Sequence, residues 1–273
     1  MRPLRTAFSL FQSQFEAADT MDGVDPAIAA LMVGGGGPED TVRIGKYVGP
    51  ARKLKPSQTT MILSKSLGGA VKMLRKDKVG GDIGAMISSD GYIMDGHHRW
   101  SASILAGGKD AQVKGFQADL PGDTLVRLLN VISKGEFGFT RGNPGGGSIT
   151  DYTPERIEKA LKVAVGAGIT GEKPATAVQV CEALEIGFGS VARGIVKMAN
   201  NSLYMVKSTP SWAPDRSQMP IIPKEVVGQA AAMLARGDVD WAYPYRMATL
   251  RARTIRCAAE HPEMRPYLLP LLR

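Results

Sequence analysis

Residues 92–106 read YIMDGHHRWSASILA, and this segment is the most informative one in the chain. Residues 92–94 have the pattern of a short strand, and residues 100–106 have the pattern of a short helix. Between them stand five residues of functional type, Asp95-Gly96-His97-His98-Arg99, which include two of the three histidines in the protein. The sequence therefore predicts a polar loop at a strand-to-helix junction. The alternative is a hairpin end whose polar side chains are satisfied locally.

Outward from this segment, the spacing of apolar residues predicts further helices and strands. Leu67, Ala70, Val71 and Leu74 repeat at the spacing of one helical face. The remaining elements are a strand at 83–87, a turn at 88–91, a strand at 112–118 and a helical face over 125–132. The order strand, helix, hairpin, helix, strand, helix predicts an α/β (α+β) fold.

Two glycine-rich stretches, at 34–38 and 142–148, divide the chain. Glycine loses the most backbone entropy on ordering and proline lacks an N–H donor, so such stretches are costly inside a helix or strand. We therefore expect four segments, which are an N-terminal arm (1–40), a sheet-containing domain (41–135), a linker (136–150) and a mainly helical domain (151–273).

The second half of the chain has helical patterns. Thr153-Pro154-Glu155 predicts a helix start, because it combines a capping residue, a proline at the first position and an acid in the first turn. Two short helices are expected at 176–184 and 191–199, joined by residues 185–189. Their length is typical of a helix-turn-helix motif, in which Arg193 and Lys197 would face DNA phosphates, and a plain helical bundle is the alternative.

Three later segments complete this half. Helices are expected at 225–236 and 245–260, and the second of them carries Arg246, Arg251, Arg253 and Arg256. These arginines indicate a solvated basic face or a phosphate contact. The proline-punctuated segment 215–220 is interpreted as a cap on the helical domain, with the wall of a ligand cleft as the alternative.

Composition bounds the class of protein. The chain has 273 residues, of which 44% are hydrophobic and 22% charged, so disordered, collagen-like and coiled-coil proteins are excluded. Its formal charge of +8 favours partners that carry phosphate. Cys181 and Cys257 lie far apart without CxxC spacing, which indicates a reducing compartment. No apolar run of about 18 residues occurs, so we expect a cytoplasmic protein without a membrane span.

The five polar residues point to phosphate chemistry. A helix start leaves backbone N–H groups unpaired and binds anions, and Gly96 allows a close backbone approach. Arg99 can grip phosphate oxygens in a bidentate way, while His97 and His98 can donate hydrogen bonds or move a proton near neutral pH. Asp95 can orient a histidine or hold Mg²⁺ between phosphates. Zinc is excluded, because adjacent histidines rarely face one metal and no further Cys or His lies nearby.

The segment also resembles a known family. Asp95-Gly96-His97-His98-Arg99, followed by an Ala- and Gly-rich helix, resembles the signature of the ParB/sulfiredoxin superfamily in the form seen in free serine kinases. The resemblance covers residues 48–120. It implies a small α/β nucleotide-binding fold whose loop holds the phosphates of ATP, ADP or CTP through Gly96, His97, His98 and Arg99. Lys65, at the start of the preceding helix, is a further candidate for phosphate contact.

The chain departs from the family pattern at two positions. The lead-in is the segment before the first helix, residues 51–58. The kinase branch implies a catalytic glutamate there after a proline, where this chain has Gln58, which cannot act as a general base. The sulfiredoxin branch implies a cysteine where His97 stands. Nucleotide binding is therefore a firmer expectation than any one reaction.

The sequence leaves three classes of function open. We rank first a protein that binds a nucleotide polyphosphate, with phosphotransfer or nucleotide hydrolysis as its reaction and with His98 and Asp95 as catalytic candidates. The second class is a DNA-binding protein or nuclease that uses the basic helical half. The third is a structural relative without activity.

Overall fold

The structure is a computed structural model, which describes residues 29–30, 32–139, 146–149, 152–166, 174–240 and 261–268. The described residues fall into two compact units. The larger unit takes its residues from 42–126 and 141–232, and the smaller one from 1–41, 127–140 and 233–273. Among the described helices, none is both long and apolar enough to cross a membrane.

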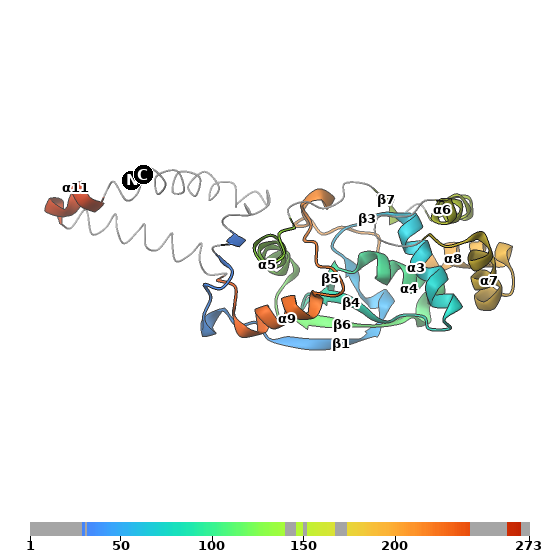
Figure 1. Ribbon diagram of the computed structural model, residues 1–273, viewed down its shortest axis with the longest axis horizontal. Coiled ribbons are helices and arrows are strands. Elements are labelled where there is room, and N and C mark those ends of the chain that lie inside the picture. Colours follow the sequence, from blue (N-terminus) through green and yellow to red (C-terminus); the bar gives the residue numbers. More distant parts are fainter. Residues whose placement is uncertain are drawn as a thin grey trace. The chain divides into compact units, whose positions relative to one another are not determined.

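A five-stranded mixed sheet lies in the larger unit (Figure 1). Its strands are β1 (Ile44–Pro50), β2 (Lys55–Pro56), β4 (Gly81–Ile87), β5 (Tyr92–Asp95) and β6 (Gln112–Ala118). Their order is β1-β6-β4-β5-β2. The β4–β5 and β1–β6 pairs are antiparallel, and the β4–β6 and β2–β5 pairs are parallel. The predicted α/β fold with its central hairpin is therefore confirmed.

Helices α3 (Leu63–Arg75) and α4 (His97–Gly107) pack against each other beside this sheet. Three later helices cover them, which are α6 (Pro154–Gly166), α7 (Ala177–Phe188) and α8 (Val191–Ser202). Helix α3 contacts α6 and α7, and α4 contacts α8 (Figure 1). The other helices within the described residues are α5 (Gly122–Gly135), α9 (Val227–Arg236) and α11 (Arg265–Leu268).

Short elements connect these parts. Strands β3 (Thr60–Met61) and β7 (Gly147–Ser148) form a separate antiparallel pair. The 3-10 helices are η2 (Pro38–Asp40), η3 (Ala51–Lys53), η4 (Gly108–Asp110), η6 (Arg216–Gln218) and η7 (Pro262–Met264).

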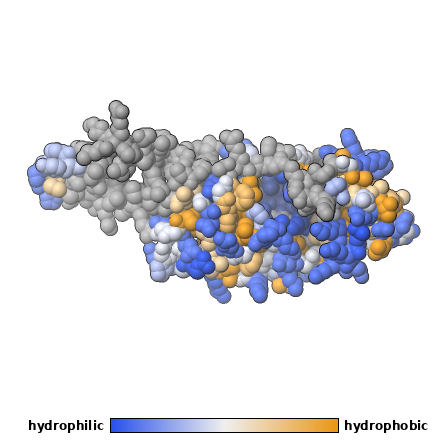
Figure 2. Space-filling view, in the orientation of Figure 1, coloured by the Kyte–Doolittle hydropathy of each residue, from blue (hydrophilic) through white to orange (hydrophobic). Residues whose placement is uncertain are grey.

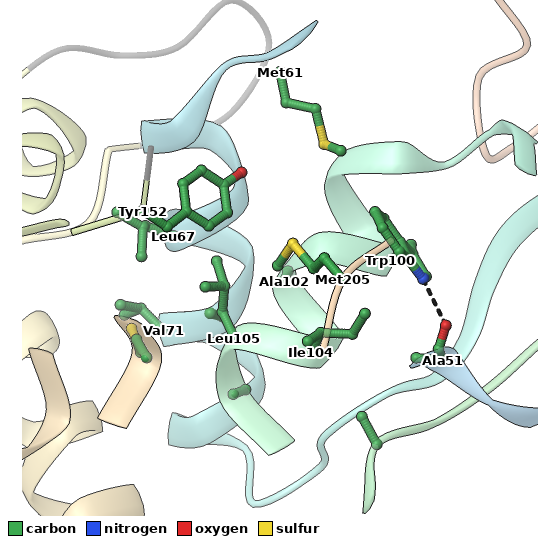
Figure 3. Close-up of a cluster of buried hydrophobic side chains, with 14 of the residues drawn as sticks. Ala51, Met61, Leu67, Val71, Trp100, Ala102, Ile104, Leu105, Tyr152 and Met205 are labelled. Carbon is green, nitrogen blue, oxygen red and sulfur yellow. Dashed lines mark hydrogen bonds between the residues drawn. The ribbon is translucent and has the colours of Figure 1, made fainter. Parts of the chain in front are cut away.

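The core of the larger unit surrounds Trp100 (Figure 3). The Trp100 side chain is fully buried, and its Nε1 donates a 2.8 Å hydrogen bond to the carbonyl oxygen of Ala51. Leu67 of α3, Leu105 of α4 and Met205 are buried in the same cluster. Each such side chain contributes about 1.5–3 kcal/mol by leaving water. The helix that begins in the polar loop is thus anchored in the core.

The division into units differs from the expected boundary at 136–150. Helices α6, α7 and α8 come after that segment, but they belong to the same unit as the sheet. The physical reason is that α3 packs against α6 and α7 as well as against α4, so apolar residues of all these helices are buried in one cluster. The expected loop at 185–189 is also shorter than predicted. Helix α7 continues to Phe188, and Gly189, with φ 81°, ends it.

Two helix ends lie at the predicted residues. Helix α6 starts at Pro154, and α9 ends at Arg236. The expected helix 245–260 lies outside the described residues, as does the expected arm over 1–28. In the smaller unit, the glycine stretch packs closely on another segment, because a Cβ on Gly36 would come within 2.1 Å of the Gly237 carbonyl oxygen. Close packing therefore explains that glycine.

Candidate functional site

The five polar residues lie at a strand-to-helix junction, as predicted, but only Gly96 stands between the two elements, because the helix begins three residues before the expected residue 100. Strand β5 ends at Asp95, and α4 begins at His97. Gly96 between them has φ 93°, in the left-handed region that favours glycine, and a Cβ there would lie 3.2 Å from the Ala85 Cβ. As the N-cap residue it has no side chain to cap the helix. The first turn of α4 therefore presents backbone N–H groups and the positive end of the helix dipole.

A cavity of about 220 Å³ opens at this junction. All six residues predicted for the site line it, and these are Lys65 and Asp95 to Arg99. The other lining residues are Gln58, Gly69, Met73, Arg216, Met219, Pro220 and Ile221. We call residues 95–99 the motif wall and residues 216–221 the distal wall.

The side chain of His97, a residue of the motif wall, is buried. Its Nε2 lies 3.0 Å from the Oγ of Ser57, and the same hydroxyl donates a 2.6 Å bond to the Ile93 carbonyl oxygen. Because a hydroxyl carries one hydrogen, we assign Nε2 as the donor to Oγ. Burial is the main cause that lowers the pKa of His97 to about 3, and the positive charge of Arg216 is the second. The ring is neutral and holds the loop against the lead-in segment.

His98 is also held as a neutral ring. The Ile62 backbone N–H, just before α3, donates a 3.1 Å hydrogen bond to its Nε2. Burial, followed by the charges of Lys65 and Arg216, lowers the pKa of His98 to about 3. Its ring hydrogen is then on Nδ1, which can donate to a ligand. The expectation that these imidazoles move a proton near neutral pH conflicts with both pKa values.

Arg99 braces the motif wall against β4. Its Nε donates to the carbonyl oxygen of Ile83 at 2.5 Å, and its Nη2 donates to that of Gly84 at 3.1 Å and to Asp95 Oδ2 at 2.9 Å. These bonds occupy the side of the guanidinium that the expected bidentate phosphate grip needs. The Nη1 group forms no hydrogen bond with the described residues, and the side chain is 34% exposed. Arg99 can therefore offer a ligand only Nη1.

Asp95 is the one carboxylate among the residues that line the cavity. Burial raises its pKa to about 6, although the neighbouring Arg99 charge opposes the shift. The described residues contain no cluster of three Asp, Glu, His or Cys side chains that could hold a metal ion. Asp95 alone fits Mg²⁺ only if phosphate oxygens complete the coordination, as such ions commonly require.

Arg216, which the sequence analysis did not name as a site residue, faces the cavity from the distal wall. Its Nη1 donates a hydrogen bond to the Thr60 carbonyl oxygen in β3. Residues 216, 219 and 220 line the cavity, so the segment 215–220 has the alternative role given for it, the wall of a cleft, and not the favoured role of a cap on the helical domain. The prolines of this segment were its only signal, and they indicate irregular backbone without indicating where it lies.

Gln58 also faces the cavity, where the resemblance implies a glutamate. Its Oε1 is buried and has no hydrogen-bond partner among the described residues. The lining thus contains three cations, Lys65, Arg99 and Arg216, against one carboxylate and two neutral imidazoles. Such a cavity attracts anions.

Comparison of the chain with protein-family models found no match, and searches of curated proteins and of solved structures found none either. The resemblance to the ParB/sulfiredoxin superfamily therefore stays a prediction that rests on the motif and on the order of the elements around it.

Proposed function

We propose that the protein binds a nucleotide polyphosphate such as ATP, ADP or CTP, with its phosphates in the cavity between the motif wall and the distal wall. One observation carries the proposal. Three cations surround a cavity into which the uncapped start of α4 also opens. Backbone N–H groups at a helix start and cationic side chains are the donors that phosphate groups use in proteins.

The size of the cavity suggests which part of the ligand it takes. Sites that enclose a whole drug-sized ligand have about 300–1,000 Å³. The cavity here has about 220 Å³, so it suits the phosphates, while the ribose and base would lie at its mouth.

The reaction that fits the site is phosphotransfer or nucleotide hydrolysis, with Asp95 as the group that accepts a proton. The Asp95 carboxyl has a pKa raised by burial to about 6, so it is mostly ionised at pH 7 and still basic enough to take a proton. His98, with a pKa lowered by burial to about 3, would act as a hydrogen-bond donor through Nδ1. If Asp95 instead held Mg²⁺, the ion would neutralise phosphate charge and Asp95 would not accept the proton.

Calorimetric titration of the full chain with ATP, ADP and CTP, with and without Mg²⁺, tests the binding. We expect Lys65→Met to weaken binding about tenfold or more, because it removes a charge from the cavity. Lys72→Met is the matched control, since Lys72 is an exposed lysine on the same helix and does not line the cavity. If the parent chain binds none of the three nucleotides, the proposal is wrong.

Product analysis tests the reaction. The parent chain is incubated with ATP and Mg²⁺, and ADP formation is compared with that of Asp95→Asn. We expect the variant to bind ATP and to lose ADP formation. Equal rates in both proteins would remove Asp95 from the reaction.

DNA binding is the second candidate, because Arg193 and Lys197 are exposed on α8 as a helix-turn-helix requires. However, the apolar Val178, Ile186 and Val196 are half or more exposed on α7 and α8, and Figure 2 shows hydrophobic surface where Figure 1 places these helices. DNA phosphates favour cationic and polar surface, so this face suits DNA less well. Salt-dependent binding of duplex DNA that Arg193→Ala weakens would favour the alternative.

A further inference from the structure

The motif wall supplies less charge than its sequence indicates. His97 and His98 are neutral, and Arg99 is bonded to two backbone carbonyls and to Asp95. The charge of Arg99 is thereby largely offset by that of Asp95. The motif wall consequently offers a phosphate mainly neutral donors, namely the N–H groups of α4, with the Nη1 of Arg99 in addition.

The distal wall supplies a cation that acts across the cavity. Burial, through desolvation, lowers the pKa of Arg216. At both His97 and His98, the charge of Arg216 lowers the pKa more than that of Arg99 does, although Arg99 is their neighbour in sequence. The field of Arg216 therefore reaches the motif wall.

The distal wall is also fixed in place. The Arg216 guanidinium is bonded to the Thr60 carbonyl oxygen. Upstream, Trp212 packs edge-on against Tyr92 with ring centroids 5.2 Å apart, and downstream Lys224 Nζ donates to the Asp82 carbonyl oxygen at 2.9 Å. Arg216 is thus held at the cavity before any ligand arrives, which lowers the entropic cost of binding.

The cavity has room for more than one phosphate. Its volume of about 220 Å³ is enough for several water molecules, and a single phosphate group would fill only part of it. Donors are present on two walls, so a ligand with two linked phosphates can use both.

We propose that Arg216 binds a second phosphate group of the ligand while the start of α4 holds the first, so that the site selects nucleoside di- and triphosphates over monophosphates. The inference rests on the proposed function and adds the residue that discriminates between ligands. A guanidinium suits this role, because it stays charged when partly buried and presents several donors in one plane.

The test compares ADP with AMP by calorimetric titration of the full chain. We expect the parent to bind ADP at least tenfold more tightly than AMP. Arg216→Gln, which keeps a donor for the Thr60 carbonyl but removes the charge, should weaken ADP binding ten- to hundred-fold and change AMP binding less than threefold. Arg216→Lys should restore most of the preference. Arg75→Gln is the control and should change neither affinity, because Arg75 is an exposed arginine on α3 that does not line the cavity.

The outcomes separate this inference from the proposed function. If the parent binds ADP and Arg216→Gln keeps the same ratio of ADP to AMP affinity, the inference fails and the proposed function stands. If the variant weakens both ligands equally, Arg216 is not selective and the inference also fails. If the parent binds neither ligand, the proposed function fails as well.

A second measurement on the parent covers the case in which Arg216→Gln does not fold. The protein is treated with an arginine-specific dicarbonyl reagent, and modification of Arg216 is followed by peptide mass spectrometry. We expect ADP to protect Arg216 and AMP to leave it reactive. Equal reactivity in the presence of either ligand, each at a saturating concentration, would overturn the inference.

Discussion

The two walls of the cavity use their polar groups differently. On the motif wall, His97, His98 and Arg99 are each hydrogen-bonded to the surrounding chain, and they shape the loop. On the distal wall, Arg216 is also hydrogen-bonded, to the Thr60 carbonyl oxygen, but its charge lowers the pKa of both histidines more than that of Arg99 does. Polar residues gathered in a motif are therefore not always the ones that carry charge to a ligand. A motif can build a site for which a distant segment supplies the cation.

The largest expected effect is on stability, and it compares the residue that anchors the motif wall, Trp100, with the one that anchors the distal wall, Trp212. Trp100→Ala should lower the free energy of unfolding by about 3–5 kcal/mol, because it empties a fully buried site and removes the bond to Ala51. Trp212→Ala should cost about 2 kcal/mol, because that half-buried ring loses part of its apolar burial, against Gly122 among others, as well as its contact with Tyr92. Urea denaturation measures both. Equal losses would show that the distal wall is as much part of the core as α4.

Arg99→Ala tests whether Arg99 is chiefly a brace. It should lower the free energy of unfolding by about 1.5–3 kcal/mol, because the carbonyl groups of Ile83 and Gly84 lose a charged donor. Arg75→Ala is the matched control, as its 3.8 Å pair with Glu182 is largely exposed and should contribute about 0–1 kcal/mol. If Arg99→Ala is as stable as the parent, Arg99 is not a brace, and its role is ligand binding alone.

The pH dependence of stability tests whether the motif wall is neutral. Burial lowers the pKa of His97 and His98 from 6.5 to about 3, so between these values the unfolded chain binds two more protons and stability rises with pH. Burial raises the pKa of Asp95 from 3.8 to about 6, so this group lowers stability as pH rises over that interval. At pH 5 the three groups together give a net uptake of about one proton on unfolding.

Replacing one group at a time separates these contributions. His97→Asn should reduce the slope of unfolding free energy against pH near pH 5 by about 1.4 kcal/mol per pH unit, and Asp95→Asn should increase it by about the same amount. Denaturation at pH 4.5, 5 and 5.5 measures the slopes. An unchanged slope in His97→Asn would mean that the imidazole is charged in the folded protein, and the contrast between the walls would disappear.

How much of the site could be read from the sequence depends on how local each signal is. The apolar strand, Gly96 and the helix after it follow one another directly, so the junction and its uncapped helix start were predictable. Lys65 was predictable because it stands at the start of a helix with clear periodicity. The hydrogen bonds of His98 and Arg99 were not, since they depend on the Ile62 N–H and on carbonyl groups of β4, which the fold brings to them.

Arg216 shows the limit of such reasoning most clearly. It lies in an irregular segment far along the chain, and nothing in its neighbours indicates that the segment returns to the sheet. The packing of Trp212 on Tyr92 places it there, and edge-on ring contacts leave no periodic pattern in a sequence. The glycine-rich stretch at 142–148 also suggested a domain boundary, whereas α6, α7 and α8 pack in the same unit as the sheet.

The smallest expected effect concerns two neighbours in the lead-in. Ser57 Oγ is bonded to both the Ile93 carbonyl and His97, whereas the buried Oε1 of Gln58 has no partner among the described residues. Ser57→Ala should therefore lower the free energy of unfolding by about 1–3 kcal/mol. Gln58→Met should leave it unchanged or raise it by up to about 1 kcal/mol, because the variant removes an unsatisfied acceptor. If Gln58→Met costs as much as Ser57→Ala, the amide is hydrogen-bonded in solution, and the lead-in side of the cavity is as fully satisfied as the motif wall.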